Sequence, residues 1–325
     1  MRRLMQLLLL VTLLLTLPTA ALARPLPPAS TAPDLSFAVI SDIHVIAGDR
    51  EAEQRLRTAL LDIHRAAPDA ALLVVNGDLG NGRPQDYEQL RAILASTPHP
   101  PVRYTIGNHE FYRAFYTPDG RYSRESFPNG ETDGTAIARF LAFAGRDRVY
   151  GTETVAGYPF IYLGSECSRI SRLEYADSAC LSHDQLSWLK ARLAEAHASG
   201  RPIFVFLHQP ITQTVAGSAF PAYMRAVQQG EELRALLQQY PEVILFSGHT
   251  HWALSHPLTL VRQGFTMVNS SSVRSPSDAR DRQILGMSEG LIVSVYPDRV
   301  LIRGREFGRG RWVPEATFSI PQGQR

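Results

Sequence analysis

Five short apolar runs each end in a polar motif, and this arrangement constrains the fold more than any other feature of the sequence. Phe37–Ile40 leads into Ser-Asp-Ile-His, and Val243–Phe246 leads into Ser-Gly-His-Thr-His. The other three runs lead into Asn-Gly-Asp, Gly-Asn-His-Glu and a single histidine. Apolar runs of this length indicate buried strands, and open α/β sheets build their sites at strand ends. The sequence therefore predicts an α/β fold with one polar site at the strand ends.

The polar residues after these runs are of the types that bind metal ions through carboxylate, amide and imidazole atoms. They are Asp42, His44, Asp78, Asn108, His109, Glu110, His208, His249 and His251. His249 and His251 are two residues apart, and an extended backbone would turn both side chains to the same side. One His-x-His pair is weak evidence for a metal site, but five fragments together are much more specific.

The ordered set Asp-x-His, Gly-Asp, Gly-Asn-His-Glu, His and Gly-His-x-His resembles the motifs of the calcineurin-like metallophosphoesterase superfamily. The resemblance covers nearly everything from Leu35 onward. It implies a four-layer αββα sandwich, in which two mixed β-sheets are flanked by helices. It also implies a metal-dependent phosphoric ester hydrolase, a phosphodiesterase or a phosphatase, that acts on a small phosphate ester.

The resemblance further implies two divalent metal ions and a metal-bridging hydroxide as the nucleophile. The first ion would be bound by Asp42, His44, Asp78 and His251. The second ion would be bound by Asp78, which bridges the two, and by Asn108, His208 and His249. Oxygen and nitrogen ligands without thiolate suit Mn²⁺, Fe²⁺ or Zn²⁺, and the sequence does not choose among them.

Two more residues receive catalytic roles from the resemblance. His109 would lie over the metals, donate to the phosphoryl group and protonate the leaving oxygen, while Glu110 would orient a partner or hold a loop. Asn81 stands where the phosphoprotein phosphatases usually carry a carboxylate followed by arginine, which argues against a serine/threonine protein phosphatase. Purple acid phosphatases would carry tyrosine in place of Asn81 and glycine in place of His44.

Two alternative functions are weaker. A non-catalytic descendant that keeps the fold for metal or ligand binding would be expected to have lost ligands, and the full set is present. A single-zinc hydrolase, such as an amidase, would leave half of the ligands without a role. Metal stoichiometry would separate the single-zinc hydrolase from the two-metal enzyme.

The N-terminus has the features of a secretory signal peptide. Arg2 and Arg3 precede a leucine-rich run too short to span a bilayer, and Ala21-Leu22-Ala23 is a small-x-small cleavage site. We expect a signal peptide at 1–23, a Pro/Ala-rich linker at 24–34 and one phosphoesterase domain at 35–325. The expected localisation is secreted or periplasmic, with no membrane span after cleavage; a retained N-terminal anchor is the alternative.

Bulk charge does not indicate a nucleic-acid partner. The formal charge of +2, less the two arginines of the leader, leaves a neutral mature chain. Cys167 and Cys180 are the only cysteines, and in a secreted chain they predict a disulfide, with two free thiols as the alternative. Oligomeric state and physiological substrate do not follow from the sequence.

Hydrophobic periodicity and capping residues predict helices over 49–67, 84–96, 135–144, 182–197 and 230–239. Asp62-Ile63-His64 repeats the Asp-x-His pattern, but side chains two apart on a helix diverge, so we expect no metal site there. Ser182 and Gln185 predict a capping box. Strands are expected over 149–154 and 158–164, and after Trp252 over 254–256, 265–269, 290–295, 300–304 and 317–320.

Two stretches remain open in function. Phe111–Asp133 is irregular and rich in aromatic residues. It could cover the site and bind substrate, or it could pack as a surface insertion. Arginines cluster around the hairpin expected near Pro297 and Asp298, where a solvated face is the expectation and phosphate binding the alternative. They are Arg299, Arg303, Arg305, Arg309 and Arg311.

Overall fold

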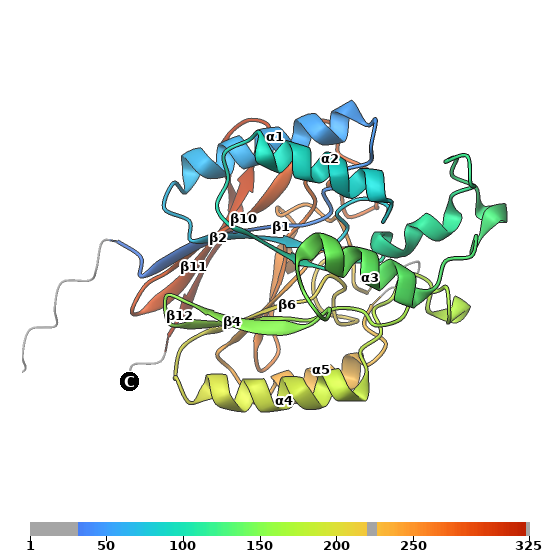
Figure 1. Ribbon diagram of the computed structural model, residues 1–325. Helices are drawn as coiled ribbons and strands as arrows, with labels where there is room; N and C mark the ends of the chain where they lie inside the picture. Colours follow the sequence, from blue (N-terminus) through green and yellow to red (C-terminus); the bar gives the residue numbers. More distant parts are fainter. Residues whose placement is uncertain (1–31, 220–225, 323–325) are drawn as a thin grey trace, which may run out of the picture. The chain divides into compact units, whose positions relative to one another are not determined.

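The computed structural model describes residues 32–219 and 226–322, so the expected signal peptide and most of the linker lie outside the described residues. Two six-stranded mixed β-sheets pack face to face, and helices cover their outer faces (Figure 1). The expected α/β architecture, with two mixed sheets flanked by helices, is confirmed. Within the described residues, none of the helices combines the length and apolar composition needed to cross a bilayer.

The first sheet has the order β12-β11-β10-β1-β2-β3. Its strands are β1 (Leu35–Ile40), β2 (Leu72–Asn76), β3 (Val102–Thr105), β10 (Glu289–Val295), β11 (Arg299–Glu306) and β12 (Arg311–Pro321). β1, β2 and β3 are parallel, whereas β10 runs antiparallel to β1 and begins the hairpins that β11 and β12 complete. The three parallel strands therefore end at the same edge of this sheet.

The second sheet has the order β4-β5-β6-β7-β9-β8. Its strands are β4 (Gly151–Val155), β5 (Tyr158–Tyr162), β6 (Ile203–Phe206), β7 (Val243–Ser247), β8 (Leu260–Arg262) and β9 (Thr266–Asn269). β5, β6, β7 and β9 are parallel, and antiparallel β4 and β8 close the two edges. β6 and β7 are fully buried apolar strands, as their sequences predict.

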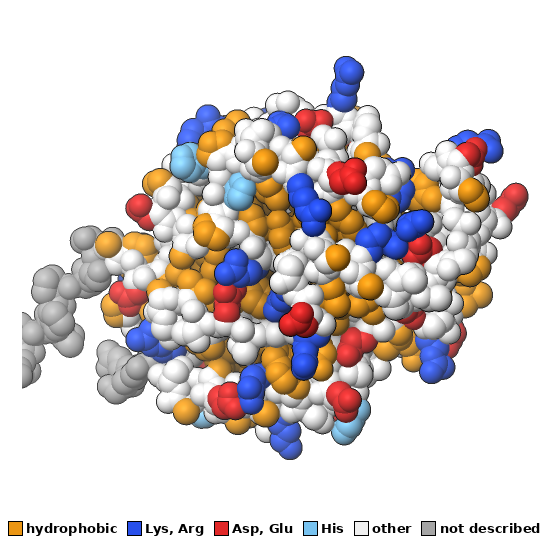
Figure 2. Space-filling view, viewed as in Figure 1, with side chains coloured by type: hydrophobic (Ala, Val, Ile, Leu, Met, Phe, Trp, Pro, Cys, Tyr) orange, Lys and Arg blue, Asp and Glu red, His pale blue; other side chains and the backbone are white. Residues whose placement is uncertain are grey.

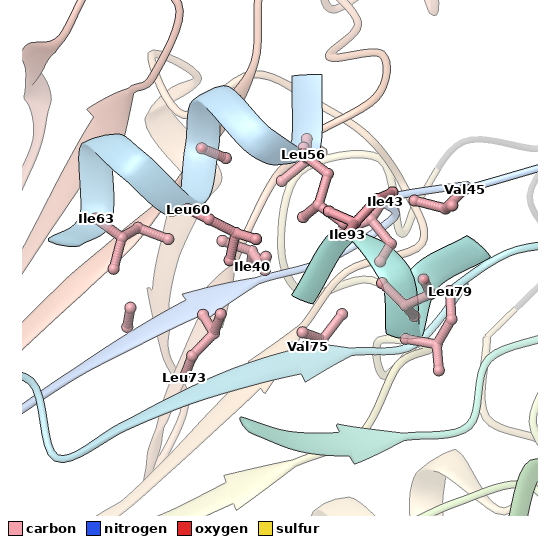
Figure 3. Close-up of a cluster of buried hydrophobic side chains, with 14 of the residues drawn as sticks. Ile40, Ile43, Val45, Leu56, Leu60, Ile63, Leu73, Val75, Leu79 and Ile93 are labelled. Atoms are coloured by element: carbon pink, nitrogen blue, oxygen red, sulfur yellow. The ribbon is translucent and has the colours of Figure 1, made fainter. Parts of the chain in front are cut away.

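Three apolar layers hold the sandwich together. α1 (Arg50–Ala66) and α2 (Pro84–Ala95) cover the first sheet, and Figure 3 shows side chains of these helices packed on those of β1 and β2. α4 (His183–His197) and α5 (Gly230–Leu237) cover the second sheet. Between the sheets, the Phe37 ring lies edge-on to Phe160 and Phe204, with centroids 5.0 and 4.9 Å away. α3 (Asp133–Ala144) packs against the first layer.

Several local expectations were wrong. Leu254–His256 is not a strand, and β8 was not anticipated. Ser182 does cap α4 by accepting from the Gln185 amide at 3.1 Å, but no capping box forms. The Gln185 side chain is buried instead, and it binds the backbone N–H and C=O of Gly164. The Ser182 backbone N–H, which Gln185 would bind in a capping box, donates to Glu166 Oε2 at 2.6 Å instead.

The arginine hairpin also differs from a uniformly solvated face. Arg305 is buried and binds Asp62 of α1 through Nε at 2.6 Å and Nη2 at 2.9 Å. Asp62, which we did not expect to bind metal, thus joins α1 to β11 through its contacts with Arg305. Arg303 lies over the ring of Trp312 at 3.8 Å, so the guanidinium groups of this cluster serve packing as well as solvation.

Candidate metal centre

The candidate residues from all five motifs follow strand ends and come together at one edge of the sandwich. Those from the first sheet are Asp42 and His44 after β1, Asp78 after β2, and Asn108, His109 and Glu110 after β3. His109 and Glu110 begin the 3-10 helix η1 (His109–Phe115). Those from the second sheet are His208 after β6, and His249 and His251 after β7. We call the segments 41–44, 77–78, 107–108, 208 and 248–251 the ligand loops.

The ligand loops place their titratable side chains in two groups, whose possible ligand atoms lie within 4.8 Å of one another. One group is Asp42, His44, Asp78 and His251, and the other is Asp78, His208 and His249. His251 Nε2 lies 2.9 Å from Asp42 Oδ1, and His208 Nε2 lies 3.3 Å from Asp78 Oδ1. Asp78 belongs to both groups, so its carboxylate lies between them.

Several atoms that face this space are buried without a hydrogen-bond partner in the described part of the chain. They include Asp42 Oδ1, Asn108 Oδ1, His208 Nε2 and His249 Nε2. Burying a polar atom unpaired is costly and rare in folded proteins. Divalent cations in the two groups would pair all four, and the mixture of carboxylate, amide and imidazole donors fits such ions. The site therefore fits divalent metal ions.

Hydrogen bonds behind the histidines fix which ring nitrogen faces the two groups. His208 Nδ1 donates to the backbone oxygen of Asn76 at 2.7 Å, because a carbonyl can only accept. His251 Nδ1 contacts the backbone oxygen of Ser275 at 3.2 Å and its hydroxyl at 3.0 Å. Nε2 of each ring is therefore directed toward the carboxylates, and it is the nitrogen that would bind a metal ion once the ring is neutral.

The backbone of the ligand loops is held in an uncommon conformation. Positive φ values occur at Asp42 (53°), His44 (44°), Asp78 (55°), His249 (67°) and His251 (59°). Non-glycine residues rarely adopt this region, and such strain clusters at functional sites. The extended geometry assumed for His249 and His251 was therefore wrong. The left-handed turns send these two histidines to different groups.

Gly248 allows two loops from opposite sheets to touch. A Cβ atom at this position would lie 1.8 Å from Ser41 Oγ and 2.6 Å from Asp42 Oδ2. The adjacent His249 N–H donates to Asp42 Oδ2 at 2.9 Å, and Ser41 Oγ donates to the same oxygen at 2.5 Å. Oδ2 of Asp42 is thus held by two protein donors, while Oδ1 of Asp42 faces the space between the candidate metal ligands. The glycine of Gly-His-x-His is required by this close approach.

Asn76 joins the two sheets beneath the site. Its side-chain nitrogen donates from β2 to the backbone oxygens of Leu207 and Phe246, at 3.3 and 3.1 Å, in the second sheet. Its side-chain oxygen accepts from Thr105 of β3 at 2.8 Å. The residue is fully buried, so every polar atom of this amide is paired within the protein.

His109 faces the shared carboxylate and is held on its other side. Its Nε2 lies 3.9 Å from Asp78 Oδ2, and its Nδ1 lies 2.7 Å from Asn81 Oδ1. Asn81 Nδ2 in turn donates to the Tyr116 hydroxyl at 2.7 Å. The Asn81 nitrogen is therefore the donor to tyrosine, its oxygen accepts from His109 Nδ1, and His109 Nε2 is directed to the site.

The profile of the calcineurin-like phosphoesterases matches residues 35–253. The chain belongs to this family. A probable cyclic nucleotide phosphodiesterase from Rhodopseudomonas palustris is 27% identical over 233 residues, 68% of this chain and 73% of that protein. With this family and the ligand set described above, the chain is a metal-dependent phosphoester hydrolase.

Two solved structures show the same fold. A dimetal phosphatase from Danio rerio superposes with a TM-score of 0.63 at 17% identity, covering 90% of this phosphoesterase and all (100%) of that chain. A purple acid phosphatase from yellow lupin seeds gives 0.59 at 14% identity, covering 88% and 53%. At these identities the likeness concerns the fold.

Beside the ligand loops of the phosphoesterase, a second set of residues supports His109. Tyr112 stacks on the His109 ring with centroids 3.9 Å apart, and its hydroxyl donates to Asp177 Oδ1 at 2.8 Å. Arg169 forms an ion pair with Asp177 and lies over Phe115 at 5.5 Å. We call Tyr112, Arg169 and Asp177 the His109 wall.

A disulfide closes the segment that carries two residues of the wall. Cys167 and Cys180 are bonded, as predicted, and no free thiol remains. Arg169 and Asp177 lie inside this loop. The wall was not anticipated from the sequence, although Tyr112 follows His109 by three residues, the spacing at which side chains of a 3-10 helix eclipse. The remainder of Phe111–Asp133 packs on its own aromatic rings, as Phe115 does on Phe127 at 4.9 Å.

Glu110 lies beneath the site and binds the ligand loops through their backbone. Its carboxylate accepts from the amides of Asp78 at 3.2 Å, Leu79 at 2.8 Å and Gly107 at 2.6 Å. Burial, and then the charge of Asp78, raises the pKa of Glu110 to about 7. These contacts hold the ends of β2 and β3 at a set distance.

The charges of the site are arranged to receive cations. Burial disfavours the ionised carboxyl of Asp42, but His251 and His208 outweigh it and hold its pKa below the ordinary value. Burial likewise opposes protonation of His208, yet Asp78 and Asp42 raise the pKa of His208 to about 10. Burial and the charge of His208 lower the pKa of His249 to about 3. The two carboxylates thus favour positive charge in the space that metal cations would take.

Proposed function

We propose that this phosphoesterase is a binuclear enzyme that hydrolyses small phosphodiesters outside the cytoplasm. The observation that carries the binuclear centre is the place of Asp78, whose carboxylate belongs to both groups of ligand atoms. A shared carboxylate is the feature that distinguishes a two-metal clamp from two unrelated sites. A single-metal hydrolase would leave one of the groups, with its buried unpaired atoms, without a role.

In this proposal the first ion is held by Asp42, His44, Asp78 and His251. The second ion is held by Asp78, Asn108, His208 and His249. When bound, the ions neutralise the phosphoryl oxygens and lower the pKa of a coordinated water. The donor set suits Mn²⁺, Fe²⁺ or Zn²⁺. The protein's own contribution is to hold these atoms in register through the hydrogen bonds behind them.

His109 is proposed as the catalytic residue that faces the substrate. In the imidazolium form, with Nδ1–H on Asn81, its Nε2–H would donate to the phosphoryl group and pass that proton to the leaving oxygen, which leaves a neutral ring. The 2.7 Å contact of Nδ1 with Asn81 supports this role, because it keeps the proton-transferring nitrogen toward Asp78 and the metal space. Glu110 is proposed as a positioning residue, since its carboxylate accepts from backbone amides in the ligand loops and at the adjacent Leu79.

The arginines around the site favour a diester over a monoester. Arg83 is paired with Asp86 at 2.6 Å, Arg274 with Asp49 at 3.2 Å, and Arg169 with Asp177. A phosphomonoester carries about one more negative charge than a diester near neutral pH, and these neutralised arginines do not offer a counter-charge for it. The likeness to a probable cyclic nucleotide phosphodiesterase makes cyclic nucleotides the first natural diesters to test.

Export is proposed from two features at different places in the chain. The leader at 1–23 carries the n-region, apolar run and cleavage site of a signal peptide. The disulfide between Cys167 and Cys180 supports it, because structural disulfides persist in oxidising compartments. N-terminal sequencing of the exported protein tests this proposal: a mature chain that begins at Arg24 is expected, and one that begins at Met1 would contradict it.

The binuclear centre is tested by metal content and turnover together. We expect about two equivalents of metal per chain by mass spectrometry, and faster hydrolysis of bis-p-nitrophenyl phosphate than of p-nitrophenyl phosphate. Asp78→Asn should lower both metal content and diester turnover, the latter by at least about 10³-fold. One tightly bound metal in the active wild type would contradict the two-metal proposal. Preference for the monoester would contradict the diester proposal alone.

The role of His109 is tested separately from metal binding. His109→Ala should keep the metal content of the wild type and lower kcat by about 10²-fold or more. Asn81→Asp, which retains an acceptor for Nδ1, is the matched variant and should keep much of the activity. An unchanged kcat in His109→Ala, with both metals in place, would remove His109 from the catalytic residues.

A further inference from the structure

A pocket of about 320 Å³ lies where the edge strands of the two sheets meet, away from the metal centre. Its walls come from β3, from β4 and β5, and from the end of α3, and no residue of the ligand loops lines it. Figure 2 looks onto this face, where Lys/Arg and Asp/Glu side chains lie close together near the centre. Its volume is within the range of small-molecule sites.

Arg146 enters this pocket with one guanidinium nitrogen unpaired in the described part of the chain. Its Nη1 is buried and has no hydrogen-bond partner among the described residues. The guanidinium lies 4.9 Å from the ring centroid of Tyr162 and against the backbone of Gly151, where a Cβ would be 2.4 Å from Nη2. The lack of a side chain at Gly151 thus makes room for the guanidinium. Burial lowers the pKa of Arg146, but arginine stays charged in proteins.

The carboxylate of Glu153, which also lines the pocket, already accepts hydrogen bonds from other groups. Glu153 accepts from Arg103 Nε at 2.8 Å and Nη2 at 2.9 Å, and from the Tyr162 hydroxyl at 2.7 Å. The positive charge of Arg103 and the negative charge of Glu153 therefore cancel within the pocket. The charge that remains is the single positive charge of Arg146. A partly buried charge without a partner is unfavourable unless an anion joins it.

We propose that this pocket is a second ligand site, which binds a small organic monoanion through a carboxylate on Arg146. One negative charge matches the residual charge of the pocket. A planar carboxylate also matches the fork of N–H donors on a guanidinium. Val102, Tyr104 and Ala144 supply apolar wall for the rest of the ligand. The site does not depend on the proposed function of the metal centre.

Binding of benzoate to the metal-loaded protein tests the site. Calorimetric titration should give a Kd for wild type that Arg146→Gln weakens by at least about tenfold, the loss of one charge-assisted pair. Arg148→Gln is the matched control, because Arg148 lies two residues further on, is exposed, and changes the net charge equally. Equal affinities of wild type and Arg146→Gln would overturn the proposal.

A second measurement does not depend on the folding of a variant. Crystals of the wild-type protein soaked in 4-bromobenzoate should show anomalous density for bromine in the pocket, with the carboxylate against Arg146. Density at the metal centre in addition leaves this expectation intact. Bromine at the metal centre or on the surface, with none beside Arg146, would overturn the proposal whatever the calorimetry shows.

Discussion

The ligand loops and the His109 wall border the same space, but different interactions hold them in place. The ligand loops are set by backbone: left-handed residues, a glycine with no room for a side chain, and amides that bind Asp42 and Glu110. The wall is set by side chains: a ring stack, an ion pair and a disulfide. Changes in the first region should therefore abolish metal binding, whereas changes in the second should alter turnover with the metals retained.

The largest effect is expected where the two loops touch at Gly248. Gly248→Ala places a methyl group against Ser41 and Asp42, so the Asp42 carboxylate must move. We expect loss of bound metal and a fall in turnover of at least about 10²-fold, the order of effect that a displacement of about 1 Å can cause. Metal analysis and diester kinetics measure both.

Gly134→Ala is the control for this change. A Cβ at Gly134 would lie 3.8 Å from its nearest neighbour, Thr132 Oγ1, and the residue is in the first turn of α3, where alanine is favoured. Wild-type metal content and turnover are expected. If Gly248→Ala also retained both metals and full turnover, the backbone account of the ligand loops would be wrong.

An intermediate effect is expected from the wall. Tyr112→Ala removes the ring on which His109 stacks, so kcat should fall by about tenfold, less than in His109→Ala, with metal content unchanged. Tyr112→Phe keeps the ring and loses the bonds of the hydroxyl to Asp177 and to Asn108 Nδ2, and it should restore most of kcat. Tyr122→Ala, an exposed change in the same insertion, serves as the control. Loss of metal in Tyr112→Ala would show that wall and ligand loops are not separable.

The smallest effect on turnover is expected from the disulfide. Replacing both Cys167 and Cys180 with alanine should lower the free energy of unfolding by about 3 kcal/mol. It should change kcat only a few-fold, because Arg169 and Asp177 still have each other and Tyr112 as partners. Chemical denaturation and diester kinetics separate the two quantities. A loss of turnover as large as that of His109→Ala would place the disulfide among the determinants of the site.

The same contrast explains how much could be predicted from the sequence. The ligand loops can be recognised as short sequence motifs, since a strand end, a glycine and a ligand must be adjacent in the chain. The His109 wall has no such motif, because Tyr112 and Asp177 are 65 residues apart and their contact depends on how an irregular insertion packs. Local rules also failed where tertiary contacts overrode them, as when Gln185 turned from the helix end to Gly164.

Asn76 has a consequence for how the molecule can move. One amide side chain binds β2, β3 and the ends of β6 and β7 together, directly behind residues that come from both sheets. These hydrogen bonds join the two sheets at the edge that carries the metal centre. These bonds oppose separation of the sheets at this edge, and so they help to keep the two halves of the metal centre at a fixed distance.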